Sequence, residues 1–271
     1  MLRILSSNAS EPSSDFVESK RQDGEDNVQW LRRNLGAAGE GMRRKGERSE
    51  EGRKPNYEAT LLLLLGSRGH TPFRVRVAQS HLRHDFTPSH WSHVALLGPV
   101  SRNVAQTRLY EISLEPPQGF GLPTSTNALQ TGKLEVYADP ERHPNIALLR
   151  LPVDVTDWQK ETTKEEISLV ERFQKQRSVL DGTELLLHWL AFLWGVGRAG
   201  NPLLEGNGVP SAAMVEVVLS AMRYDITPGL ESRASCPEAI WQAAKWWHPF
   251  YSSQRTEALE GFFHVGHKLE V

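Results

Sequence analysis

The chain contains a single cysteine, Cys236, among its 271 residues. One thiol excludes an internal disulfide framework and any zinc site built from several cysteines. A single cysteine leaves the compartment open, and a reducing cytosol is the default expectation. The formal net charge is only −2, so the chain has no overall basic bias of the kind that indicates nucleic-acid binding.

Long apolar runs are also missing. The most apolar helical stretch, Thr183–Val196, is shorter than the roughly 20 residues that a membrane-spanning helix needs. The first ten residues lack the apolar core of a secretory signal. We therefore expect no transmembrane segment and interpret Thr183–Val196 as a buried core helix, with a membrane-touching helix as the less favoured alternative.

The residues that are present are those of a globular protein, with 39% hydrophobic and 24% charged. Residues 1–56 differ from the rest, because they are rich in Ser, Glu, Arg and Gly and poor in large apolar side chains. Such a segment buries too little surface to offset its ordering entropy. We predict a disordered or weakly ordered extension over 1–56, with one short helix at Val28–Leu31, followed by a folded domain over 57–271.

The folded part divides into a strand-rich half and a helical half, which predicts an α+β fold: a small antiparallel sheet or half-barrel packed against helices. The final residues, 256–271, fit a strand or a helix equally well. The expected strands are Leu61–Leu65, Phe73–Ala78, Trp91–Gly98, Tyr110–Ser113, Lys133–Tyr137 and Ile146–Leu151. The expected helices are 157–173, 183–196, 212–222 and 237–247.

Three residues on these expected strands and helices fit a nucleophilic triad. His93 lies on one expected strand, Glu111 on the next, and Ser211 at the start of an apolar helix. A base, a carboxylate and a hydroxyl are the parts of such a site. The structural alternatives are a core histidine and an N-cap serine. Cys236, just before Pro237, is the alternative nucleophile, because a helix N-terminus stabilises a thiolate; a purely structural cysteine is the other interpretation.

The loop from 80 to 90 is rich in histidine and invites a metal interpretation. His81, His84, Asp85 and His90 are all potential ligands, but their spacing matches no firm metal template. We therefore expect neither a metal nor a cofactor.

The order of the motifs resembles that of the circularly permuted NlpC-like, papain-fold hydrolases, the YiiX-like group distantly related to lecithin:retinol acyltransferase. Trp-Ser-His-Val-Ala-Leu-Leu-Gly at 91–98 is similar to their histidine strand, and Leu-Tyr-Glu-Ile-Ser at 109–113 to the acid strand. Ala-Leu-Leu-Arg-Leu-Pro at 147–152 resembles a third strand. Pro-Ser-Ala-Ala-Met-Val-Glu at 210–216 resembles the nucleophile helix, usually Cys-Ser-Glu-Leu-Val. Tyr-Asp-Ile-Thr-Pro-Gly and Ser-Cys-Pro-Glu-Ala-Ile, at 224–229 and 235–240, resemble the loop and helix start that follow. The resemblance spans about Tyr57 to Trp247.

One departure bears directly on function. The position of the family's cysteine is occupied by Ser211, or by Pro210 if the alignment slips by one residue. The resemblance implies acyl transfer: hydrolysis of an amide, thioester or ester bond, or transfer to an acceptor, with His93 as base, Glu111 orienting it and Ser211 as nucleophile. The substrate would be a peptide or an acyl compound. The alternative is a catalytically inactive papain-like binding or adaptor module with a protein partner.

Overall fold

The fold is described here from a computed structural model. It describes residues 16–35, 59–115, 127–154, 173–174, 176–177, 180–253 and 259–266. The helix expected over 157–173 lies almost wholly outside the described residues.

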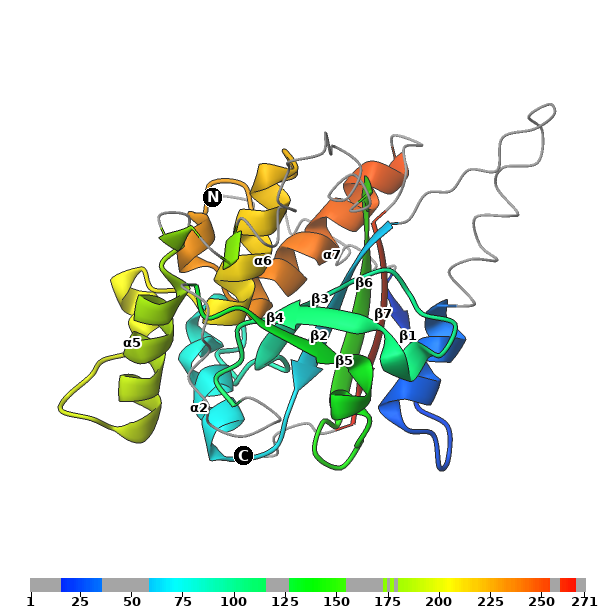
Figure 1. Ribbon diagram of the computed structural model, residues 1–271, viewed down its shortest axis with the longest axis horizontal. Helices are drawn as coiled ribbons and strands as arrows, with labels where there is room; N and C mark the ends of the chain where they lie inside the picture. The colour runs from blue at the N-terminus through cyan, green and yellow to red at the C-terminus, as the bar shows by residue number, and fades with distance from the viewer. Residues whose placement is uncertain are drawn as a thin grey trace, which may run out of the picture.

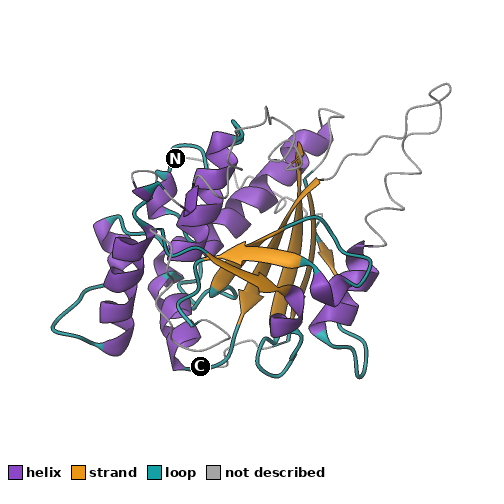
Figure 2. Ribbon diagram, in the orientation of Figure 1, coloured by secondary structure: helices purple, strands orange, loops and turns teal. Residues whose placement is uncertain are grey.

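The centre of the molecule is a seven-stranded mixed sheet (Figures 1 and 2). The strand order is β1-β7-β6-β2-β3-β4-β5, and every neighbouring pair is antiparallel except β1 and β7. The strands are β1 (Val17–Glu18), β2 (Ala59–Gly66), β3 (His93–Leu97), β4 (Arg108–Glu111), β5 (Gln130–Lys133), β6 (Asn145–Asp154) and β7 (Glu260–Val265). The predicted α+β class is confirmed, but the sheet is larger than expected and is not purely antiparallel.

Four helices cover one face of this sheet, and shorter helical segments cover the other (Figure 1). The first group contains α2 (His70–Ala78), α5 (Gly182–Trp194), α6 (Pro210–Ala221) and α7 (Pro237–Ser253). The second group contains a helix over residues 27–35 and the 3-10 turns η2 (Val104–Gln106) and η3 (Leu134–Tyr137). The remaining 3-10 turns are η1 (Ser80–Leu82), η5 (Pro202–Glu205) and η6 (Ser232–Ala234).

The alternation of side chains along the strands divides the apolar residues into two cores. Leu62 and Leu64 of β2 pack with the four-helix side, whereas Leu61, Leu63 and Leu65 pack on the opposite side. All five leucines are buried, as expected for a central strand covered on both faces.

The N-terminal segment belongs partly to this fold, which corrects the expectation of a weakly ordered extension over 1–56. Val17 of β1 pairs with Phe262 of β7. Trp30 and Leu31 are buried in the second core, and the Trp30 indole donates a 2.7 Å hydrogen bond to the Ser19 carbonyl. The predicted short helix at Val28–Leu31 is confirmed within the helix over 27–35. Residue 57 is therefore no domain boundary for this part of the chain.

The segment Phe73–Ala78 is a helix, not the predicted strand. A run of six residues fits both periodicities, and the flanking residues decide between them. Gly69 adopts a φ of 112° as the N-cap, and Pro72 lies in the first turn, where proline is tolerated. The buried side chains Pro72, Val75 and Arg76 then share one helical face.

The strand predicted over Lys133–Tyr137 is also wrong in its bounds. The strand β5 ends at Lys133, and Leu134–Tyr137 forms the turn η3. Leu134 and Tyr137, three residues apart, are both buried, which a 3-10 turn allows because it places residues i and i+3 on one side. The ambiguous tail contains the strand β7.

Candidate active site

Two of the predicted site residues are in direct contact. His93 opens β3, Glu111 closes the neighbouring strand β4, and His93 Nε2 lies 2.7 Å from Glu111 Oε2. The His93 side chain is 12% exposed and that of Glu111 only 3%. The register of the two strands, with Leu97 opposite Leu109, makes the two residues diagonal neighbours on one face.

Tyr137 completes this contact from the turn η3. Its hydroxyl donates a 2.7 Å hydrogen bond to the same Glu111 oxygen, and its ring centroid lies 6.0 Å from that of His93. Burial and the Glu111 charge hold the pKa of Tyr137 well above its ordinary value. The phenol therefore stays a hydrogen-bond donor, and Glu111 is oriented from two sides.

The polar cluster of His93, Glu111 and Tyr137 lies on the face of the sheet opposite α6. His93 lies opposite Leu65, and Ala95 lies opposite Leu63, so the side chain of His93 points toward the second core. The intervening residue, Val94, belongs to the first core, which α6 covers. The sheet itself thus stands between His93 and the helix that carries Ser211.

Ser211 occupies the second position of α6, after Pro210, and is fully buried. Its hydroxyl accepts a hydrogen bond of 3.4 Å from the backbone N–H of Val94. Within the part of the chain that the structure describes, no hydrogen bond joins Ser211 to His93. The arrangement brings together the predicted base and acid but leaves the predicted nucleophile on the other face.

Cys236, the alternative nucleophile, is 1% exposed and directly precedes α7. Burial raises the pKa of its thiol to about 12. The helix N-terminus was expected to stabilise a thiolate, but desolvation outweighs it here. The thiol is therefore protonated at neutral pH and packs as a small apolar group.

The polar cluster contains two further residues that the sequence did not single out. The hydroxyl of Ser67, just after β2, lies 2.7 Å from His143 Nδ1. The His143 ring meets that of Tyr137 edge-on at 5.0 Å. Burial, then the charges of Arg142 and His93, lower the pKa of His143 to about 4. The only sequence signal for Ser67 is its place directly after a buried strand.

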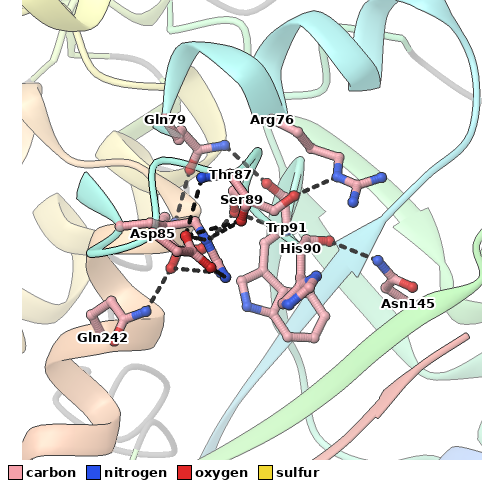
Figure 3. A network of polar contacts seen from close by, with 11 residues as sticks. Arg76, Gln79, Asp85, Thr87, Ser89, His90, Trp91, Asn145 and Gln242 are labelled. Atoms are coloured by element: carbon pink, nitrogen blue, oxygen red, sulfur yellow. Dashed lines mark hydrogen bonds and ion pairs between the residues drawn. The ribbon is translucent and has the colours of Figure 1, made fainter. Parts of the chain in front are cut away.

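The strand β3 is positioned by a buried polar network at its entry (Figure 3). Glu238 of α7 accepts a 2.6 Å hydrogen bond from the hydroxyl of Ser89, and its backbone N–H donates to Gln79 Oε1. Gln79 in turn donates 2.9 Å to the carbonyl of Trp91. The guanidinium of Arg76 donates to the Ser89 carbonyl. This network ties α2 and α7 to the residues that immediately precede His93.

A second buried carboxylate anchors the loop after α6. Glu216 accepts hydrogen bonds from Thr227 at 2.7 Å and Ser235 at 3.2 Å. Burial raises the pKa of Glu216 to about 7, although both hydrogen bonds act to lower it. These contacts join the two segments at 224–229 and 235–240 to the helix that carries Ser211.

Polar side chains of the histidine-rich loop at 80–90 bind to groups close by in the chain. Asp85 pairs with Arg83 at 3.0 Å and accepts a hydrogen bond from the Thr87 hydroxyl, while His81 Nδ1 contacts the carbonyl of Ala78. Among the described residues, no three His, Cys, Asp or Glu side chains gather as metal ligands would.

The sequence predicts no transmembrane segment. Over the described ranges, none of the helices combines the length and apolar character required to cross a bilayer. Comparison of the chain with protein-family models, with curated proteins and with solved structures finds no match.

Proposed function

We propose that the chain is a hydrolase or acyltransferase of permuted papain-like (NlpC-like) architecture, acting on an amide, thioester or ester bond of a peptide or acyl substrate. The observation that carries the proposal is the 2.7 Å contact between His93 Nε2 and Glu111 Oε2. A carboxylate behind an imidazole orients the ring and stabilises its protonated form during acyl transfer.

The ring of His93 has the geometry that this role needs. With Nε2–H facing Glu111, Nδ1 carries the lone pair that accepts a proton. The side chain keeps 12% exposure, so the ring is not sealed in the core. Tyr137 holds the shared Glu111 oxygen from the other side, which restricts the carboxylate to one position.

Chain order supports the papain-like part of the proposal. The histidine strand, the acid strand and the helix of Ser211 follow one another as in the permuted family, and α6 packs on the face of β3 that carries Val94. The single cysteine is compatible with a reducing cytosol, where we place the protein.

The second candidate is a catalytically inactive binding module. It is favoured by the environment of Ser211, whose hydroxyl is buried and bonded to the backbone of Val94. In that case the His93–Glu111 pair would stabilise the fold or contact a protein partner.

Hydrolysis assays on the full chain distinguish the two candidates. A p-nitrophenyl ester, an acyl thioester and a peptide amide are offered to the wild type and to His93→Gln. The enzyme proposal expects turnover of at least one substrate and a fall of about 100-fold or more in His93→Gln.

The matched control is His84→Gln, because His84 is exposed and lies outside the polar cluster. Its turnover should equal that of the wild type. Absence of turnover on all three substrates, or equal rates in His93→Gln and wild type, would favour the binding module.

A further inference from the structure

We propose that Ser67 is the nucleophile of this site and His143 its general base, with an ester or thioester as the substrate class. The inference rests on the proposed acyl-transfer function and replaces Ser211 in it. Ser67 Oγ lies 2.7 Å from His143 Nδ1. A hydroxyl within hydrogen-bond reach of an imidazole is the first geometric requirement of a serine nucleophile.

Ser67 lies on the same face of the sheet as the His93–Glu111 pair. Leu65 of β2 is opposite His93, and Ser67 follows the end of β2 directly, where its hydroxyl contacts His143 and the His143 ring meets that of Tyr137. Ser67 is partly exposed, whereas Ser211 is fully buried, so a substrate reaches Ser67 without a change of fold.

The imidazole rings of His93 and His143 both lie next to the ring of Tyr137. Its ring centroid is 6.0 Å from that of His93 and 5.0 Å from that of His143. The charge of His93 also acts on the titration of His143. Ser67, His143, Tyr137, Glu111 and His93 therefore form one cluster, in which His93 is placed to activate the water that releases the acyl group.

His143 is held in place as a base must be. Its backbone N–H donates to the Asp139 carbonyl at 3.0 Å, and its carbonyl accepts from Asn27 Nδ2 at 3.0 Å. Burial keeps the ring neutral at pH 7, since its pKa is about 4. We assign the proton to Nε2, which leaves the Nδ1 lone pair to accept the hydroxyl proton of Ser67.

Donors for a developing oxyanion lie next along the chain. The helix α2 begins three residues after Ser67, and no side chain caps its N-terminus. The first-turn N–H groups of His70 and Thr71 have no partner within the helix. Together with the helix dipole, such groups stabilise negative charge on a tetrahedral intermediate.

The reaction balances with water as the only co-reactant. Ser67 Oγ forms a bond to the acyl carbon while its proton passes to His143 Nδ1. The bond from the acyl carbon to the leaving oxygen or sulfur breaks, and the leaving group takes that proton. Water then attacks the acyl-serine, losing a proton to His93, which returns it to Ser67 Oγ as the acid departs.

The surroundings of His143 select the substrate class, because its buried ring contacts the Ser67 hydroxyl and the Tyr137 ring, and no carboxylate among the described residues is hydrogen-bonded to it. A base of low pKa removes the serine proton less effectively than an ordinary histidine does. The acyl carbon must therefore be electrophilic, and esters and thioesters lack much of the resonance stabilisation of an amide. We expect ester and thioester turnover to exceed peptide-amide turnover.

Phosphonylation followed by peptide mapping tests the assignment on the unaltered chain. The wild type is treated with a fluorophosphonate, digested and analysed by mass spectrometry for the modified serine, in parallel with ester hydrolysis. An adduct on Ser67 is the expected result. An adduct on Ser211 or another serine, or hydrolysis with no adduct, overturns this inference and leaves the acyl-transfer proposal standing. Neither adduct nor hydrolysis overturns both.

Ser67→Cys provides a second test that tolerates small changes in stability. Its thiol, beside His143, should react with iodoacetamide about tenfold faster or more than in Ser67→Cys/His143→Asn. Asparagine keeps a polar atom near the position of Nδ1 but supplies no base. The buried Cys236 gives the background rate. Equal rates in the two variants would overturn the role of His143.

Discussion

His93 and Glu111 meet through Nε2 and Oε2 at 2.7 Å, on the face of the sheet that α6 does not cover. The pair is joined there by Tyr137 and by the Ser67–His143 contact. The polar residues of the candidate site thus lie together at one end of the second core. Each of the following predictions depends on that placement or on the buried groups that hold it.

Gly66, the last residue of β2, is packed too closely to carry a side chain. A Cβ at this position would lie 2.0 Å from the His90 carbonyl oxygen and 2.9 Å from the Asn145 side chain. Neither the backbone nor the packed strand can give way, so Gly66→Ala should lower the free energy of unfolding by about 3 kcal/mol or more. Urea denaturation measures this loss.

The control for that substitution is Gly200→Ala. Its Cβ would approach only the end of the Glu205 side chain, at 3.1 Å, and a flexible carboxylate can move. The expected change is within about 0.5 kcal/mol. Equal stabilities of Gly66→Ala and Gly200→Ala would show that the end of β2 does not pack against His90 and Asn145 as described.

Cys236 should be inert in the folded protein. With a pKa of about 12, about one thiol in ten thousand is ionised at pH 8, and the side chain is 1% exposed. We expect iodoacetamide to label the native chain no faster than it unfolds and to label the chain in urea within minutes. Rapid stoichiometric labelling of native protein would restore Cys236 as a nucleophile.

Two buried groups should give the stability of the protein opposite pH dependences. The pKa of His143 falls from 6.5 to about 4 on folding. At a pH between these two values the imidazole is protonated in the unfolded chain but not in the folded chain. Lowering the pH from 6.5 to 4 therefore lowers the free energy of unfolding by about 3 kcal/mol. The pKa of Glu216 rises from 4.5 to about 7. At a pH between these two values the carboxyl group is protonated in the folded chain but ionised in the unfolded chain. Raising the pH from 4.5 to 7 therefore lowers the free energy of unfolding by about 3 kcal/mol.

Single variants separate these effects. Relative to wild type, Glu216→Gln should become more stable, by about 3 kcal/mol, as the pH rises from 4.5 to 7. His143→Asn should show the reverse difference as the pH rises from 4 to 6.5. Urea denaturation at half-unit pH intervals measures both. If the free energy of unfolding of a variant varies with pH in parallel with that of wild type, the titratable group that the substitution removes is not buried as described.

Some of this site could be predicted from the sequence. His93 and Glu111 stand on consecutive apolar segments, and consecutive strands tend to pair. The face of the sheet could not be predicted, because β2 is leucine at all five positions from 61 to 65. A strand buried on both sides has no polar alternation to reveal where its neighbours point. For the same reason, the helix of Ser211 could not be placed on either face.

The Ser67–His143 contact was beyond the reach of sequence patterns. It joins residues 76 positions apart in the chain. It also depends on the turn that follows η3, and the residues of η3 were themselves predicted to form a strand. The helix α2 was missed for a local reason, since Phe-Arg-Val-Arg-Val-Ala satisfies a period of two as well as a helical period.

The most direct test of the account is the rate of ester hydrolysis by Glu111→Gln. This change keeps the size of the side chain but removes the charge that orients and stabilises the His93 ring. Glu135→Gln is the matched control, because Glu135 is exposed on the neighbouring turn. The account predicts a fall of about 100-fold or more in Glu111→Gln alone. A Glu111→Gln rate equal to that of wild type would contradict it.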